Sequence, residues 1–336
     1  MNILLTSVGR RAYMVKYFQQ ALAGTGFVHV CNSDDKTVAF HYADKSVISP
    51  LIYDDAYVPF LLNYCADNHI DLLLSLFDID LPVLARNKDR FAAIGTKVIV
   101  SDPEVIDICN DKWKTHNFLK EHGFHVPKTY LTLQKTILAL ESGELQYPVI
   151  VKPRFGCGSI AMSVAEDEMS LLYYFRRNVR TINKTYLKYE SSVEDEKILY
   201  QEFLPGQEYG ADIIHDLNGN FKNAIIKKKV AMRSGETDIA ELTDDPTIRR
   251  ELERLGSLTK HIGNMDCDIF MVDGVPHILE MNARFGGGYP FSHMGGCNLP
   301  QAIVNWAQGK EVPDEMLRAK TSGLGFKELM ITSIDQ

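Results

Sequence analysis

Apolar runs and amphipathic stretches alternate along the first third of the chain. Residues 2–8 (NILLTSV) predict a buried strand, and a helical pattern follows from about residue 11 to residue 23. The alternation continues, with predicted strands at 27–32, 71–76 and 97–101 and predicted helices at 57–68 and 81–91. Strands that alternate with helices are typical of a parallel, doubly wound sheet. We therefore predict an α/β domain over residues 1–105.

The rest of the chain mixes helices with strands that are joined by turns. Asp102 and Pro103 suit the N-cap and first turn of a helix. Further helices are predicted at 133–142, 246–262 and 299–308, and the polar segment 176–197 predicts a solvated helix and loop. Strands are predicted at 128–131, 148–153, 198–203, 221–230, 265–272 and 275–282, with a short one after residue 323. This mixture indicates two α+β lobes, over residues 106–198 and 199–336.

Composition narrows the class of protein. The 336 residues are 45% hydrophobic and 24% charged, with a formal net charge of -8, which argues against nucleic-acid binding as the main role. The six cysteines form no CxxC pair, which favours free thiols in a reducing compartment. The N-terminal apolar run is too short for a secretory signal, and no apolar stretch is long enough to span a membrane. We predict a cytoplasmic protein without a membrane or nucleic-acid partner.

The segment HILEMNARFGGGYP, at 277–290, carries the clearest chemistry. Residues two apart in a strand point to the same face, so Glu280, Asn282 and Arg284 should line one side. An acid and an amide oxygen suit a hard cation such as magnesium that carries phosphates. A guanidinium beside them suits an oxyanion. The simpler alternative is a polar edge strand that ends in a glycine turn.

A predicted hairpin adds a second acid to this group. Asp268 precedes the Asp273-Gly274 turn, which folds its strand back onto the strand of Glu280. Two acids that face each other across a hairpin repel unless a cation lies between them. Asp268, Glu280 and Asn282 are therefore the candidate metal ligands.

A glycine-rich turn follows the apolar strand that ends at Lys152. Gly156 and Gly158 allow backbone N–H groups to approach a phosphate, Ser159 adds a hydroxyl, and Lys152 adds a positive charge. Glycine-serine turns are common, so this segment alone is a weak signal. The chain lacks GxxxxGK[ST], GxGxxG, HExxH and GxSxG, which lowers the expectation of a P-loop, an NAD-binding fold, a zinc protease or a serine hydrolase.

The segment QEFLPGQEYG predicts a further hairpin around Pro205-Gly206. Its strand edge can offer backbone groups to a purine, with Phe203 and Leu204 as apolar walls. Glu208, past the turn, can accept hydrogen bonds from ribose hydroxyls. On this segment alone, a plain hairpin with an exposed acid is the simpler interpretation.

The order of these parts resembles the ATP-grasp superfamily: DK at 111–112, VKP with its glycine loop, EFLPG, the Asp268 strand and ILEMNAR. The chain is most similar to the branch related to carbamoyl-phosphate synthetase lobes and the pyrrolysine-biosynthesis ligase. SVGRR and LFDIDLPVLA also fit the domain that precedes the ATP-grasp module in that branch. The resemblance implies a Rossmann-like pre-ATP-grasp domain (1–105) and an ATP-grasp module of a small subdomain (106–198) and a large subdomain (199–336).

The resemblance also implies roles for individual residues. ATP phosphates would contact Lys112, Lys152 and one of Lys227 to Lys229, of which we favour Lys229. The loop from Gly156 to Ser159 would close over them. The nucleoside would be held by Gln201, the backbone of Glu202 and Leu204, the wall residue Phe203, and Glu208. Magnesium, or manganese instead, would be held by Asp268, Glu280 and Asn282, with Glu280 bridging two ions, and Arg284 would stabilise the reacting centre.

Two positions depart from the common pattern of the family. Position 268 is Asp where synthetase lobes often have Gln, and either residue can be a metal ligand. Position 201 is Gln where many relatives have Glu, and the amide oxygen can still meet the adenine amino group.

The substrate contacts are less well defined by the sequence. Arg10 and Arg11 follow the first strand, where open α/β sheets bind ligands, so they could clamp a carboxylate or form surface salt bridges. Asp78 and Asp80 follow the third predicted strand and could bind an amine, although helix N-capping is simpler for at least one of them. Segment 231–243 is a further candidate for specificity.

The expected reaction joins a small-molecule carboxylate to an amine through an acyl phosphate and releases ADP. One alternative is phosphorylation of bicarbonate or carbamate, as in synthetase lobes. Another is an ATP-binding regulator without turnover. The resemblance also suggests a homodimer, and the substrates themselves are not specified by the sequence.

Overall fold

The N-terminal part of the chain folds into a parallel sheet, in a computed structural model that describes residues 1–156, 160–191, 193–320 and 323–332. The strand order is β3-β2-β1-β4-β5, and the neighbours are parallel. The strands are β1 (Asn2–Thr6), β2 (Val28–Asn32), β3 (Lys45–Ile48), β4 (Ile70–Ser75) and β5 (Lys97–Val98). The connecting helices are α1 (Ala12–Leu22), η1 (Val38–His41), α2 (Tyr57–Asp67), α3 (Asp80–Arg86) and α4 (Lys88–Ala92). The predicted parallel α/β domain is confirmed.

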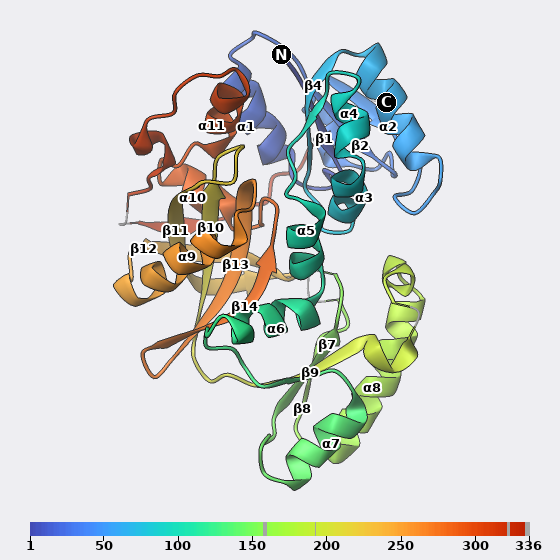
Figure 1. The fold of residues 1–336 in the computed structure, drawn as a ribbon, viewed down its shortest axis with the longest axis vertical. Helices are drawn as coiled ribbons and strands as arrows, with labels where there is room; N and C mark the ends of the chain where they lie inside the picture. The colour runs from blue at the N-terminus through green and yellow to red at the C-terminus, as the bar shows by residue number, and fades with distance from the viewer. Residues whose placement is uncertain (157–159, 192, 321–322, 333–336) are drawn as a thin grey trace.

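Next comes a smaller antiparallel sheet with the order β6-β9-β7-β8. Its strands are β6 (Thr129–Tyr130), β7 (Val149–Pro153), β8 (Ser163–Ala165) and β9 (Ile198–Glu202). Two helices lead into it, α5 (Pro103–Asn110) and α6 (Lys112–Glu121). The elements that accompany it are α7 (Leu133–Glu141), α8 (Glu168–Asn183), η2 (Tyr186–Tyr189) and η3 (Glu194–Glu196). Figure 1 shows this lobe at the lower end of the molecule, with α7 and α8 beside its strands.

The last part of the chain forms a large antiparallel sheet with the order β14-β13-β10-β11-β12-β15. Its strands are β10 (Gln207–His215), β11 (Phe221–Arg233), β12 (Glu236–Thr243), β13 (Gly263–Val272), β14 (Val275–Asn282) and β15 (Leu324–Phe326). The helices are α9 (Pro246–Thr259), α10 (Tyr289–Met294), α11 (Leu299–Ala307) and η4 (Asp314–Leu317). The predicted combination of a parallel-sheet domain with two α+β lobes is therefore confirmed.

Several expectations from the sequence are corrected. The predicted hairpin in QEFLPGQEYG is wrong, because β9 lies in the small sheet and β10 in the large sheet, and residues 203–206 connect the two. The predicted helix at 81–91 is divided at Asn87 into α3 and α4. Strands β3, β8 and β12 were not predicted. Because β9 belongs to the small sheet, we propose the lobe boundary at the connection 203–206 rather than at residue 198.

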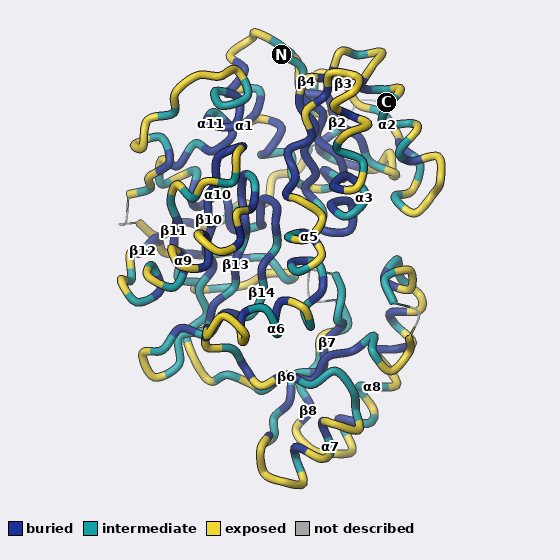
Figure 2. Tube along the Cα trace, viewed as in Figure 1, coloured by how far each residue is buried: buried dark blue, intermediate teal, exposed yellow. Residues whose placement is uncertain are grey.

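The N-terminal domain and the large-sheet lobe share a hydrophobic core. One buried cluster combines Leu5 of β1 and Phe18 of α1 with Phe285 and Tyr289, which follow β14. A separate cluster fills the small lobe. Figure 2 shows buried strands in both the upper body and the small lobe, with exposed segments around them. In the described part of the chain, no helix combines the length and apolar character that crossing a membrane requires.

Candidate active site

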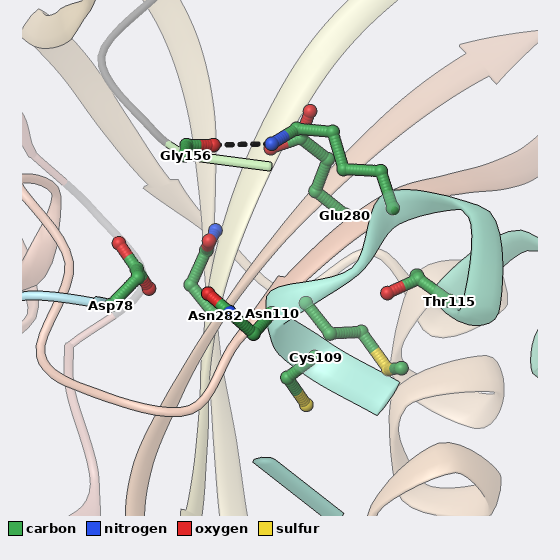
Figure 3. A pocket seen from close by; sticks show the side chains of 9 residues that line it. Asp78, Cys109, Asn110, Thr115, Gly156, Glu280 and Asn282 are labelled. Atoms are coloured by element: carbon green, nitrogen blue, oxygen red, sulfur yellow. Dashed lines mark hydrogen bonds between the residues drawn. The ribbon is translucent and has the colours of Figure 1, made fainter. Parts of the chain in front are cut away.

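A cavity of about 800 Å³ lies between the small and large sheets. Its walls come from β7, the 203–206 connection and strands β10, β11, β13 and β14, together with the glycine run 286–288. All the predicted site residues in the described part of the chain, apart from Asp78 and Asp80, line this cavity. Asp78 lines a small neighbouring cavity of about 10 Å³, together with Lys112, Glu280 and Asn282 (Figure 3). Gly158 and Ser159 lie outside the described residues.

The register of β13 and β14 brings the candidate metal ligands together. Asp268 is opposite Glu280, and Asp266 is opposite Asn282. Positions two apart in a strand share a face, so these four side chains project toward the cavity that they line. The predicted approach of Asp268 to Glu280 across the hairpin is confirmed. Asp266 was not predicted as a site residue, although its position two residues before Asp268 was a usable signal.

Lysine side chains form ion pairs with both of the predicted acidic ligands. Lys152 Nζ lies 3.0 Å from Glu280 Oε1, and Lys229 Nζ lies 2.6 Å from both Asp268 Oδ1 and Glu208 Oε1. Burial by itself raises the pKa of Glu280, but Lys112 and Lys152 outweigh it and lower that pKa to about 2. Burial lowers the pKa of Lys229, whereas Asp268 and Glu208 raise it well above its ordinary value. Glu280 and Lys229 are therefore both ionised at neutral pH.

The donor set suits a hard divalent cation. Asp268 and Glu280 supply carboxylate oxygens and Asn282 an amide oxygen, which are the ligand types that magnesium accepts. Among the described residues, no three His, Cys, Asp or Glu side chains form a ready-made metal cluster. Because both carboxylates are paired with lysines, a bound cation would have to share them with Lys152 and Lys229.

The nucleotide-side residues are arranged around β7 and β9. Lys112 Nζ donates to the carbonyl oxygen of Gly156. Gly156 has a φ of +90°, and a Cβ there would lie 2.6 Å from Leu187 Cδ2, so glycine is required. Gln201 is buried, and its Nε2 donates to Thr129 Oγ1 at 3.0 Å, which leaves its oxygen as the acceptor.

Apolar side chains complete this end of the cavity. Phe203 and Leu204 line it as predicted, and Glu202 lies beside them while its carboxylate accepts from the Lys128 N–H. Sequence reasoning missed other apolar wall residues, among them Ile150, Val164, Phe270 and Leu279. They come from different strands, and a buried-strand pattern alone does not distinguish a cavity wall from a core position.

Arg284 lies beyond the end of β14 and is almost fully buried. Its Nε and Nη2 donate to Asp78 Oδ2 at 3.1 and 2.7 Å. Its Nη1 makes longer contacts, 3.4 Å to Asp266 Oδ2 and 3.3 Å to the Phe285 carbonyl. Burial raises the pKa of Asp266, and the neighbouring Asp268 raises it further, whereas Arg284 lowers it. Asp78 therefore pairs with Arg284 and does not cap α3 through its side chain, whereas amine binding by Asp78 stays a prediction.

The remaining candidates near the first strand have different roles. Arg11 Nη1 donates to the carbonyl oxygens of Leu76 and Phe285, at 2.7 and 2.9 Å, so it links backbone segments although it also lines the cavity. Arg10 is exposed and lines the cavity. Asp80 is fully buried and accepts hydrogen bonds from Thr6, Ser7 and Tyr57. It caps no helix through its side chain, so the capping interpretation is wrong for Asp80 as well.

The glycine run provides space for charged side chains. None of the residues 286–288 has a positive φ, so their conformation is open to any residue. A Cβ at Gly286 would lie 2.1 Å from the carboxylate carbon of Asp266, and one at Gly287 would lie 3.0 Å from that of Glu236. Glu236 also lines the cavity and pairs with Lys327 at 3.1 Å. Gly286 is therefore required for close approach of the Asp266 carboxylate rather than for turning.

Two family models match consecutive parts of the chain. One, described as a PylC-like N-terminal domain, matches residues 3–99, and the other, an ATP-grasp domain, matches residues 109–288. The second match covers more than half of the sequence. The chain therefore belongs to the ATP-grasp family, and the predicted resemblance is confirmed.

Similar proteins agree with this assignment. The carbamoyl phosphate synthase large chain of Methanothrix thermoacetophila is 22% identical over 278 residues, which cover 78% of this chain and 24% of that protein. The chain thus spans about a quarter of the length of such relatives. Among solved structures, the biotin carboxylase domain of Hydrogenobacter thermophilus 2-oxoglutarate carboxylase, in complex with MgADP, ADP and bicarbonate, has a TM-score of 0.74 at 14% identity (96% of this chain, 73% of that one). The L-amino acid ligase of Bacillus licheniformis has a TM-score of 0.67 at 18% identity (96% and 76%). At these identities the structural likeness supports the fold.

Proposed function

We propose that this protein is an ATP-dependent ligase that joins a carboxylate to an amine and releases ADP and phosphate. One observation carries the proposal: Asp268, Glu280 and Asn282 share one face of the large sheet with Lys229, and Lys152 approaches them from the small sheet, in a cavity between the two sheets. Oxygen donors beside ammonium groups suit the polyphosphate of a nucleotide and its magnesium ions. The amine would come from an amino acid or another amino-bearing metabolite.

The cavity has an apolar part and a charged part. A nucleotide fits with its base in the apolar part and its phosphates in the charged part. The apolar walls around Phe203 suit the faces of a purine, and the Gln201 oxygen suits its amino group. Lys112, Lys152 and Lys229 suit the phosphates. Magnesium, held by Asp268, Glu280 and Asn282, would supply neutralisation of charge on the transferring phosphoryl group.

The reaction would take place between the phosphate end and Arg284. A carboxylate oxygen of the substrate attacks the γ-phosphorus, the bond to the β-phosphate oxygen breaks, and ADP leaves. The amine nitrogen then attacks the acyl phosphate carbon, phosphate leaves with the bonding electron pair, and the nitrogen releases one proton to solvent. Arg284 would stabilise the negative oxygen that develops on that carbon.

The test is an assay for ADP with Mg-ATP, a panel of carboxylates and hydroxylamine as a trap. ADP together with a hydroxamate supports the ligase. Arg284→Ala should lower the rate on the order of 100- to 1,000-fold, the usual effect of losing one oxyanion donor. Wild-type turnover by this variant would contradict the role of Arg284, and its folding is checked by thermal unfolding.

A second candidate is phosphorylation of bicarbonate or carbamate. It is favoured by the similarity to carbamoyl phosphate synthase large chains and by the bicarbonate bound in the Hydrogenobacter thermophilus structure. ADP formation that requires bicarbonate alone would support this candidate over the ligase. An absence of ADP under every condition would instead support an ATP-binding regulator without turnover.

A further inference from the structure

The side chain of Arg284 is bound by a residue of the N-terminal domain, Asp78, which lies 206 positions earlier in the sequence. Asp78 follows β4, and its Oδ2 accepts from Nε and Nη2 of Arg284 at 3.1 and 2.7 Å. Both side chains are almost fully buried, with 8% and 5% of their surface exposed. Within its own lobe, Arg284 contacts Asp266 at 3.4 Å and the Phe285 carbonyl at 3.3 Å. The two shorter contacts with Asp78 tie the guanidinium to the N-terminal domain.

Two further contacts fix the backbone on either side of this ion pair. Arg11 Nη1 donates to the carbonyl of Leu76, close before Asp78, and to the carbonyl of Phe285, directly after Arg284. The ring of Phe285 packs edge-on against Phe18 of α1, with centroids 6.3 Å apart. The segments that carry the acid and the guanidinium are thus locked together by backbone and apolar contacts.

We propose that Asp78 is a positioning residue that aims the Arg284 guanidinium at the reacting carbon, so that the N-terminal domain completes the active centre. The inference rests on the proposed ligase function. An arginine side chain loses much rotational freedom when it is fixed, and a charged partner that receives two of its N–H groups removes that freedom before the substrate arrives. The longer Asp266 contact is the one that a developing oxyanion displaces.

Kinetic and stability measurements distinguish the positioning role of Asp78 from two other roles. If Asp78 bound the amine substrate, its loss would raise the KM for the amine and would not depend on Arg284. If Asp78 only stabilised the fold, its loss would lower stability and leave kcat per folded molecule unchanged. If it positions Arg284, its loss lowers kcat, and this effect disappears once Arg284 is absent.

The experiment is a double-mutant cycle on the full chain with Asp78→Asn, Arg284→Met and the double variant, measured by kcat for ADP release with Mg-ATP, carboxylate and amine. Asp78→Asn should lower kcat by about 10- to 100-fold, the scale of a misplaced catalytic group, with the KM for the amine changed less than about twofold. In the Arg284→Met background, the same change should alter kcat by less than about twofold. Thermal unfolding of each variant reports its folded fraction.

Asp80→Asn is the matched control, because Asp80 lies two residues further on, is buried among Thr6, Ser7 and Tyr57, and is not among the residues that line the two cavities. It should lower the unfolding temperature and leave kcat per folded molecule unchanged. If Asp78→Asn keeps wild-type kcat, or loses the same factor with and without Arg284, the positioning role is overturned while the ligase stands. If the wild-type protein releases no ADP with any carboxylate, the ligase proposal fails first, and the positioning role falls with it.

Discussion

Two lysines on one strand show how the same residue type has different roles in this molecule. Lys227 and Lys229 are two positions apart on β11, so they project from the same face of the large sheet. Lys227 is 2% exposed and pairs with Asp212, which has no exposed surface. Lys229 is 8% exposed and pairs with Asp268 and Glu208, which remain 25% and 29% exposed. Both lysines line the cavity, but the Lys227 pair is almost fully buried, whereas the partners of Lys229 are partly exposed.

The partners of each lysine explain the difference. Asp212 also accepts from Ser292 Oγ at 2.5 Å and from Asn264 Nδ2 at 2.9 Å, so its carboxylate is satisfied entirely within the protein. Asp268 and Glu208 line the cavity, where, under the proposed function, a nucleotide or a cation exchanges with Lys229. A buried network of this kind fixes the structure, whereas a half-exposed pair is available for binding.

The largest effect is expected from Lys227→Met. This change leaves the Asp212 carboxylate buried without its cation, which typically costs about 3–5 kcal/mol of unfolding free energy. Urea denaturation of the variant measures the loss. Lys228→Met is the matched control, because Lys228 points to the opposite face and should change stability by less than about 0.5 kcal/mol. Equal stability of the two variants would show that the Lys227 pair is not structural.

The turn of the hairpin that carries the candidate ligands, Asp273-Gly274, could be predicted from sequence. The pairing of Asp268 with Glu280 could not, because strict alternation from that turn would place Asp268 opposite Leu279, and a bulge between Asp268 and Ile269 shifts the register by one residue. The same reasoning failed at Pro205-Gly206. A proline-glycine pair that connects two sheets has the same local signature as one that closes a hairpin.

The pairing of Asp78 with Arg284 could not be predicted, because it depends on how two domains dock. The two residues are 206 positions apart, and neither the β4 pattern nor the β14 pattern contains information about the other. The role of the glycine run 286–288 was also predicted only in part. Its sequence suggests a turn, whereas the reason for Gly286 is the carboxylate of Asp266, which comes from a different strand.

Lys229→Met should affect ATP use more than stability. Its carboxylate partners keep about a quarter of their surface in solvent, so their loss of a cation should cost less than the roughly 3–5 kcal/mol expected at Lys227. A lost hydrogen bond to a charged group costs about 1.5–3 kcal/mol, so the KM for ATP should rise roughly 10- to 100-fold. Steady-state kinetics and urea denaturation on the same preparation separate the two effects. An unchanged KM for ATP with a large loss of stability would reverse the assignment of the two lysines.

Gly210→Ala tests the role of Lys229 with a smaller perturbation than Lys229→Met. A Cβ at Gly210 would lie 3.2 Å from Lys229 Cε but 3.9 Å from Lys227 Cε, so only Lys229 must shift. Displacing a side chain from its rotamer costs about 0.5–1.5 kcal/mol, which corresponds to a rise of roughly 2- to 10-fold in the KM for ATP. Stability should be kept, because alanine restricts the unfolded chain more than glycine does. A fall in stability without a change in KM would indicate that Lys227 had moved instead.

Gly288→Ala should have the smallest effect. A Cβ there would lie 3.6 Å from Lys227 Cε and Nζ, which is ordinary van der Waals contact, and the φ of -82° at Gly288 suits alanine. The unfolding free energy should therefore change by less than about 1 kcal/mol, as urea denaturation can measure. Gly286→Ala is the contrasting variant, because its Cβ would lie 2.1 Å from the Asp266 carboxylate carbon and something must shift. If Gly288→Ala keeps its stability but loses ADP release, the space beside Lys227 is occupied by substrate, and the buried lysine then belongs to the binding site as well.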